Sequence, residues 1–142
     1  MTPARRIAET AVDFARAYDA CGPDRARFLA CIAAVETRRN KKLGAHGEKG
    51  SYQFTRSTWQ SLTSLPFSAA DDDMHADQVA AFYFNKLRYG LLSRGLDVTV
   101  RNLAVAWNGG VNSVLLHKWA NADVRDYGVR VEALYRDREF KP

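Results

Sequence analysis

Phe28-Leu29-Ala30-Cys31-Ile32-Ala33-Ala34-Val35-Glu36 is an apolar stretch that ends in a carboxylic acid. At about 100° per residue in a helix, Glu36 falls on the same face as Leu29 and Ile32. The stretch therefore predicts a helix whose apolar face packs in the core and carries the carboxyl group of Glu36 with it.

Two effects act on a carboxylate at this place, and both have the same sign. Desolvation disfavours the anion, and so does the negative end of the helix dipole. We expect both to raise the pKa of Glu36 toward the range in which a carboxylic acid donates a proton at neutral pH. Cleavage of a sugar bond needs such an acid, because the leaving oxygen must be protonated as the bond breaks.

The composition describes a single packed domain. The chain has 142 residues, of which 46% are hydrophobic and only four are proline. A chain of this length buries roughly two thirds of its unfolded surface, so we expect one domain over residues 1–142. No apolar run approaches the ~20 residues of a membrane span, and we expect no stable membrane insertion.

The net charge limits the classes of possible binding partner but does not identify one. With 21 basic and 16 acidic residues the net charge is +5. Such a charge favours binding to nucleic acid, anionic membranes or cell-wall polymers. It is equally compatible with a basic protein that has no charged partner. No run of five basic residues occurs, and the densest cluster, residues 38–42, lacks the interleaved aromatic residues of a single-strand binding surface. We therefore expect no nucleic-acid partner.

Metal and disulfide chemistry are not indicated. Cys31 lies within the expected helix and Cys21 just before it, so the two are expected to be too far apart for a disulfide. The chain has no CxxC pair and only three scattered histidines. The acidic run of residues 71–73 reads as helix-start charges rather than metal ligands. We expect neither a metal nor an organic cofactor.

The whole chain reads as helices separated by short breaks, so the expected fold class is mainly α. A small β-hairpin near residues 38–52 is the most strand structure we expect, because Gly44, Gly47 and Gly50 prevent a helix there. We expect helices at residues 4–19, 23–37, 112–120 and 123–137. Another helix is expected to be capped by Thr55, and a long one to run from a capping box at Ser68 to about Tyr89. A further helix, capped by Thr99 or Asp97, is expected to end at Trp107 before a tight turn at 108–110.

Two further stretches complete a pattern of polar residues on loops. Residues 47–54 form a glycine-rich loop that leads to Tyr52 and Gln53, and residues 106–110 read Ala-Trp-Asn-Gly-Gly. Glycine lets a backbone approach a ligand closely, and Gln and Tyr are neutral donors and acceptors suited to hydroxylated or N-acetylated sugars. Aromatic rings that could stack on sugars are Tyr52, Tyr83, Trp107 and Trp119, whereas Trp59, Phe82 and Phe84 have the spacing of core residues.

The order of these motifs resembles the soluble lytic transglycosylases and goose-type lysozymes. Glu36 is followed by Gly-x-x-Gly-x-x-Gln-Phe at 47–54, Ala-Trp-Asn-Gly-Gly at 106–110 and Tyr-x-x-x-Val-x-x-Leu-Tyr at 127–135. The resemblance covers residues 26–136. It implies a lysozyme-like fold and peptidoglycan as the substrate. The bond cut would be that between N-acetylmuramic acid and N-acetylglucosamine, without a metal or cofactor.

The resemblance also implies roles for individual residues. Glu36 stands at the catalytic acid/base, Gln53 at a substrate-contacting glutamine, Asn108 at an asparagine that lines the cleft, and Tyr127 at a possible partner of Glu36. Ordinary structural roles remain open: a turn-stabilising amide for Gln53, a helix C-cap for Asn108 and a core position for Tyr127. The neighbouring positions expected to line the cleft are Ser51, where the family more often has an apolar residue, Tyr52, Trp107 and Gly109.

The reaction type stays open at this point. An inverting hydrolase needs a second carboxylate about 6.5–9.5 Å from the acid, and Glu48 is the nearest candidate. Without one, the substrate's own groups complete the reaction and a 1,6-anhydro product forms, which is the route we favour. Other readings are a muramidase, a chitinase, or a wall-glycan-binding module without activity.

The expected partner is the peptidoglycan strand, with the chain acting as a monomer. Glu9 and Asp13 interrupt the stretch after the basic N-terminus, so no signal peptide is visible. The localisation is left open between a periplasmic, a secreted and a phage-delivered enzyme.

Overall fold

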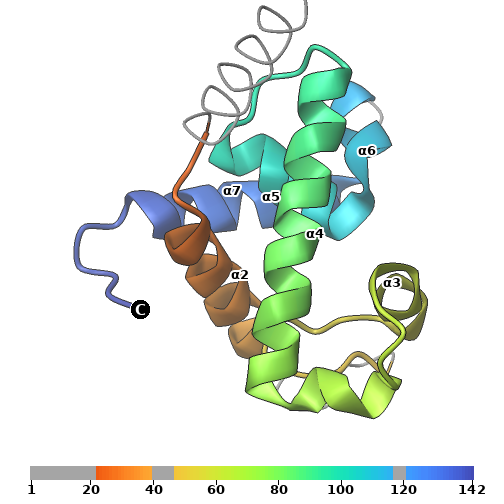
Figure 1. Cartoon of the computed structure of the whole chain (residues 1–142). Helices are drawn as coiled ribbons and strands as arrows, with labels where there is room; N and C mark the ends of the chain where they lie inside the picture. The colour runs from red at the N-terminus through yellow and green to blue at the C-terminus, as the bar shows by residue number, and fades with distance from the viewer. Residues whose placement is uncertain (1–21, 40–46, 117–120) are drawn as a thin grey trace, which may run out of the picture.

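The structure, a computed structural model, describes residues 22–39, 47–116 and 121–142, and these residues are mainly helical (Figure 1). The mainly α fold class is therefore confirmed for the described part of the chain. Its elements are α2 (Arg25–Arg39), α3 (Arg56–Leu62), the 3-10 helix η1 (Phe67–Asp71), α4 (Asp73–Ser93), α5 (Val100–Gly109), α6 (Val111–Leu115) and α7 (Ala122–Arg136).

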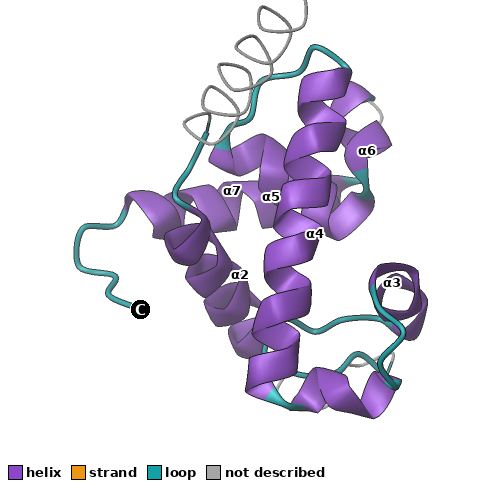
Figure 2. Ribbon diagram, in the orientation of Figure 1, coloured by secondary structure: helices purple, strands orange, loops and turns teal. Residues whose placement is uncertain are grey.

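Within the described residues, the expected β-hairpin is present only as a single β-bridge. Lys49 and Phe54 form an isolated antiparallel β-bridge, with each backbone N–H donating to the other's carbonyl at 3.0 Å. Figure 2 accordingly draws no strand in the described residues. The rest of the expected hairpin at 40–46, and the expected helix at 4–19, lie outside the described residues.

Side-chain caps start two of the helices where the sequence predicts them. The hydroxyl oxygen of Thr55 accepts a hydrogen bond from Thr58 N at 3.2 Å, and that of Thr99 accepts one from Asn102 N at 3.1 Å. Each cap satisfies one of the backbone N–H groups that a helix start leaves without a partner. Both caps are confirmed.

The predicted capping box at Ser68 is wrong. Residues Phe67–Asp71 form η1, and α4 begins only at Asp73. Asp72 is the N-cap of α4, because its carboxylate accepts from His75 N at 3.1 Å. The side chain of Asp72, four residues further along the chain, therefore caps the helix in place of Ser68.

Helix α4 is the central element, and α2, α5 and α6 all pack on it (Figure 1). Its core face is built from Ala76, Ala80, Phe84, Leu87 and Leu91, which recur every three or four residues and are buried. Phe82 lies off this face and is 54% exposed. The prediction that Phe82 is a core residue is therefore wrong, whereas Trp59 and Phe84 are fully buried as expected.

Helix α2 contributes its predicted apolar face to the same core. Phe28, Leu29, Ile32 and Val35 are buried, and Cys31 is a buried free thiol. Burial raises the pKa of the Cys31 thiol, so the group stays neutral and packs as a small hydrophobe. Among the described helices, none is both long enough and apolar enough for a bilayer crossing.

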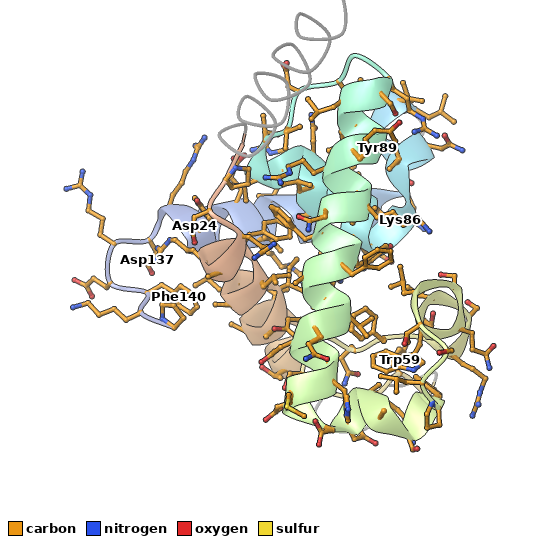
Figure 3. The ribbon with its side chains drawn as sticks, viewed as in Figure 1. Asp24, Trp59, Lys86, Tyr89, Asp137 and Phe140 are labelled. Carbon is orange, nitrogen blue, oxygen red and sulfur yellow. The ribbon has the colours of Figure 1, made fainter. Side chains whose placement is uncertain are left out.

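Arg27 attaches the C-terminal segment to the start of α2. Its guanidinium donates from Nε to the carbonyl of Tyr135 at 2.9 Å, from Nη2 to that of Asp137 at 2.8 Å and from Nη1 to that of Phe140 at 3.1 Å. The guanidinium also lies over the rings of Tyr135 and Phe140. Figure 3 shows Asp24, Asp137 and Phe140 gathered at this end of α2.

Replacing Arg27 by Lys should loosen the C-terminal segment. A lysine ammonium keeps the charge but cannot present the planar fork that meets three carbonyls, so we expect a loss of ~1–3 kcal/mol in the free energy of unfolding. Urea denaturation measures it. Arg25→Lys is the matched control, because Arg25 is exposed on the same helix turn, and an equal loss in both variants would contradict the attachment.

Candidate active site

Glu36 lies in the last turns of α2 and is only 6% exposed. It continues the buried stripe of Phe28 and Ile32 at intervals of four residues. The prediction that its carboxyl group is carried into the interior is confirmed. The carboxyl group therefore lies near the C-terminal end of α2, which is the negative end of the helix dipole.

Buried polar groups are few, and they are informative for that reason. Within the described residues, the buried polar or charged residues are Glu36, Gln53 and Arg88. Two of these three are residues that the sequence places in the site. Burial of a polar group costs free energy unless it is hydrogen-bonded, so such groups in a small helical protein call for a functional or structural reason.

Arg88 is the residue in this group that the sequence analysis does not single out. It lies on α4, and its guanidinium stands 5.3 Å from the ring centroid of Phe84. Helical periodicity does place Arg88 on the core face of α4, four residues after Phe84, but its residue type argues against burial, because arginine is rarely fully buried unless it is paired.

Gln53 combines a strained backbone with a half-satisfied amide. Its φ is +50°, the left-handed region that side chains other than glycine rarely adopt. Its backbone N–H and its side-chain Nε2 both donate to the carbonyl of Gly50, at 3.1 and 2.8 Å. The amide therefore does stabilise the turn, but its Oε1 is buried and has no hydrogen-bond partner in the described part of the chain. A buried acceptor without a partner calls for one, which a water molecule or a ligand that reaches this position would supply.

The ring of Trp107 on α5 joins this turn to the helices. Its centroid lies 6.2 Å from that of Tyr52, 5.9 Å from Phe54, 4.7 Å from Tyr83 and 6.3 Å from Phe28. We call these five rings the aromatic junction. Gln53 lies between two of its members in the chain and Asn108 follows a third, so the junction brings the segments that carry both amides together.

The junction also changes the roles expected for its rings. Tyr52 and Trp107 are 7% and 8% exposed, so their faces are occupied by other rings. Both rings therefore pack in the junction and support the segments that carry the amides, and their contact with a sugar stays a prediction. Tyr83 is part-buried, and burial raises the pKa of its phenol. Trp119 lies outside the described residues.

Asn108 and Gly109 are exposed in the last turn of α5. The predicted tight turn at 108–110 is wrong for Asn108 and Gly109, because α5 runs through Gly109 and its C-cap is Gly110, whose φ is +84°. The C-cap alternative for Asn108 is excluded for the same reason. Its side chain is thus presented at the helix end next to the aromatic junction, while Tyr127 on α7 is fully buried, as a core position requires.

Ser51 and Tyr52 both bond to the beginning of α4. Ser51 Oγ donates to Asp73 Oδ1 at 3.2 Å, and Tyr52 Oη donates to Asp77 Oδ1 at 2.7 Å. Asp77 was not predicted from the sequence, although Asp73 and Asp77 are four residues apart and share a face of the predicted helix. Glu48 is part-buried in the same segment as Gln53, and its role as a second carboxylate stays a prediction, as does the pairing of Tyr127 with Glu36.

No metal site is formed by the described residues, which contain no cluster of three or more His, Cys, Asp or Glu side chains able to hold an ion. The candidate residues are therefore a buried carboxylic acid on α2 and two amides on segments that meet at the aromatic junction. No protein-family model, no curated protein and no solved structure matches this chain.

Gly50→Ala should distort the turn that carries Gln53. A Cβ at Gly50 would lie 1.9 Å from the carbonyl oxygen of Ala70, and the φ of Gly50 is +78°. The matched control is Gly47→Ala, since Gly47 has a φ of +80° but nothing within 4 Å of its Cβ position. We expect Gly50→Ala to lower the free energy of unfolding by about 2 kcal/mol more than Gly47→Ala does, as measured by denaturation. Equal losses of stability in the two variants would mean that close packing of Gly50 against Ala70 does not matter for the turn.

Proposed function

We propose that this protein cleaves the β-1,4 bond between N-acetylmuramic acid and N-acetylglucosamine in peptidoglycan, with Glu36 as general acid and base. The observation that carries the proposal is the 6% exposure of Glu36 at the C-terminal end of α2. Burial by itself acts against the charged form of a carboxyl group, and the leaving sugar oxygen needs an acid that still holds its proton.

The surrounding groups suit a neutral, hydroxylated substrate. The buried Oε1 of Gln53 can accept from a hydroxyl or an acetamido N–H, and the exposed amide of Asn108 can both donate and accept. Neither group carries a charge, so the recognition is by hydrogen bonds to sugar. This combination of one acid with amides supports a glycosidase more than a nucleic-acid or metal-dependent enzyme.

The favoured reaction is that of a lytic transglycosylase. Glu36 gives its proton to the oxygen of the leaving sugar as the bond to C1 of N-acetylmuramic acid breaks, and the acetamido group of the same sugar stabilises C1. Glu36, now a carboxylate, takes the proton of the 6-hydroxyl while O6 bonds to C1. The products are a 1,6-anhydro end and a free sugar hydroxyl, and one residue has acted as acid and then as base.

Hydrolysis is the alternative outcome at the same site. It requires Glu48 to activate a water molecule, and the substrate is then peptidoglycan for a muramidase or chitin for a chitinase. The candidate function outside the enzymes is a module that binds wall glycan without cutting it.

Glu36→Gln should abolish the clearing of purified cell walls. The amide has nearly the same shape but no proton to give, and loss of a general acid typically costs about 10²–10⁴-fold in rate. Turbidity of a wall suspension measures the activity, and glycan binding and the melting temperature should remain close to those of the parent. Glu139→Gln, at an exposed position near the C-terminus, is the control.

Wall clearing by Glu36→Gln at the parent rate would remove the enzyme proposal. If neither the parent nor the variant clears walls but both bind glycan, the binding module is the better description.

Mass spectrometry of the digested wall separates the two reaction types. We expect muropeptides lighter by one water than reducing-end products, and Glu48→Gln should leave their formation within a few-fold of the parent rate, because no second carboxylate is needed. Reducing-end products, together with a loss of about 10²-fold or more in Glu48→Gln, would instead identify hydrolysis.

A further inference from the structure

Three consecutive contacts attach the segment before Gln53 to the acidic beginning of α4. Lys49 Nζ lies 3.5 Å from Asp71 Oδ2, Ser51 Oγ donates to Asp73 Oδ1 at 3.2 Å, and Tyr52 Oη donates to Asp77 Oδ1 at 2.7 Å. Between the first two, the Cα of Gly50 packs directly on the carbonyl of Ala70. The segment is therefore fastened along its length to η1 and to the first turns of α4.

The three contacts are not equal in strength. The Lys49–Asp71 pair is largely exposed, with side-chain exposures of 34% and 57%, and the Ser51–Asp73 bond is also exposed. Pairs of this kind contribute little. The Tyr52–Asp77 bond is part-buried and short, and a hydroxyl that donates to a carboxylate makes one of the stronger hydrogen bonds.

Tyr52 is held as a neutral donor in this bond. Its pKa is raised, first by burial of the ring and then by the hydrogen bond to Asp77. The hydroxyl therefore keeps its proton throughout the neutral range, and the bond is lost only when the phenol ionises far above it or when the carboxylate is removed. Asp73 is the other charged group from α4 that acts on the phenol.

Gln53 needs such a support because its own backbone does not favour the conformation it has. A left-handed φ at a residue other than glycine costs roughly 1–3 kcal/mol and persists only where the neighbours impose it. On one side, Phe54 is held by the bridge to Lys49 and by its ring contact with Trp107. On the other side, Tyr52 is held by Trp107 and by Asp77.

We infer that Asp77 is a positioning residue, which through Tyr52 holds Gln53 in its left-handed conformation with the Oε1 atom free to accept a hydrogen bond from a sugar. Asp77 itself is exposed and does not need to touch the substrate. The consequence for activity rests on the proposed glycan cleavage; the positioning of Gln53 does not.

Asp77→Ala and Asp77→Asn form a matched pair for the test. Both remove one negative charge, but asparagine keeps an oxygen that accepts from Tyr52 Oη. Hydrogen exchange of the backbone amides of Lys49, Gln53 and Phe54, followed by NMR, reports the turn directly. We expect about tenfold faster exchange in Asp77→Ala, and near-parent exchange in Asp77→Asn.

Wall clearing should follow the same order. Asp77→Ala should lose about tenfold in rate, and Asp77→Asn should recover most of it. Tyr52→Phe removes the donor but keeps the ring, so it should match Asp77→Ala, and the double variant Tyr52→Phe with Asp77→Ala should be no worse than either single one. Asp126→Ala, which removes an exposed carboxylate from α7, controls for the change in charge.

Unchanged exchange of the three amides in Asp77→Ala, additive effects in the double variant, or equal losses in Asp77→Ala and Asp77→Asn would each overturn the inference. If Asp77→Ala does not fold, Tyr52→Phe carries the same comparison, because its ring still fills the aromatic junction. A parent protein that does not clear walls would refute the proposed function, whereas the exchange data would still decide whether Asp77 positions Gln53.

Discussion

The contact of the Trp107 ring with four other rings is the interaction on which the rest of the structure depends. It joins α5 to α2 through Phe28, to α4 through Tyr83, and to residues 47–54 through Tyr52 and Phe54. Residues 47–54 have one bridge of their own and no regular strand, so packing rather than a sheet holds them. Aromatic side chains are suited to this, because each buries a large apolar area and offers an edge as well as a face.

The same contact explains why polar groups can be held in a small helical core. Gln53 is fixed between two rings of the junction, and its amide closes the turn on Gly50. Glu36 lies on the apolar face of α2, near the end of the helix, and its side chain is buried together with that face. The free energy to bury these groups and to hold a left-handed glutamine comes from the apolar packing around them.

Particular residues show where sequence reasoning works. The caps at Thr55 and Thr99 were predictable, because a hydroxyl at a helix start satisfies a local N–H, and the burial of Glu36 was predictable, because 3.6-residue periodicity places it with Ile32. The start of α4 was misplaced, since a 3-10 helix intervenes and Asp72 competes with Ser68 for the cap. The end of this helix was predicted too early, at about Tyr89, whereas α4 continues to Ser93 with Gly90 packed against Val111 of α6. Phe82 was taken for a core residue because the sequence does not say which face of a long helix is covered.

By itself, the sequence determined the helical class, most helix starts, the place of Glu36 on a buried face, and the turn around Gly50, because each depends on neighbours within a few residues in the chain. Only the tertiary structure decided that the rings of Tyr52 and Trp107 pack against each other and that Asp77 reaches Tyr52. These outcomes depend on residues 25 to 55 positions apart in the chain. No local pattern records which of the possible long-range contacts the packed core selects.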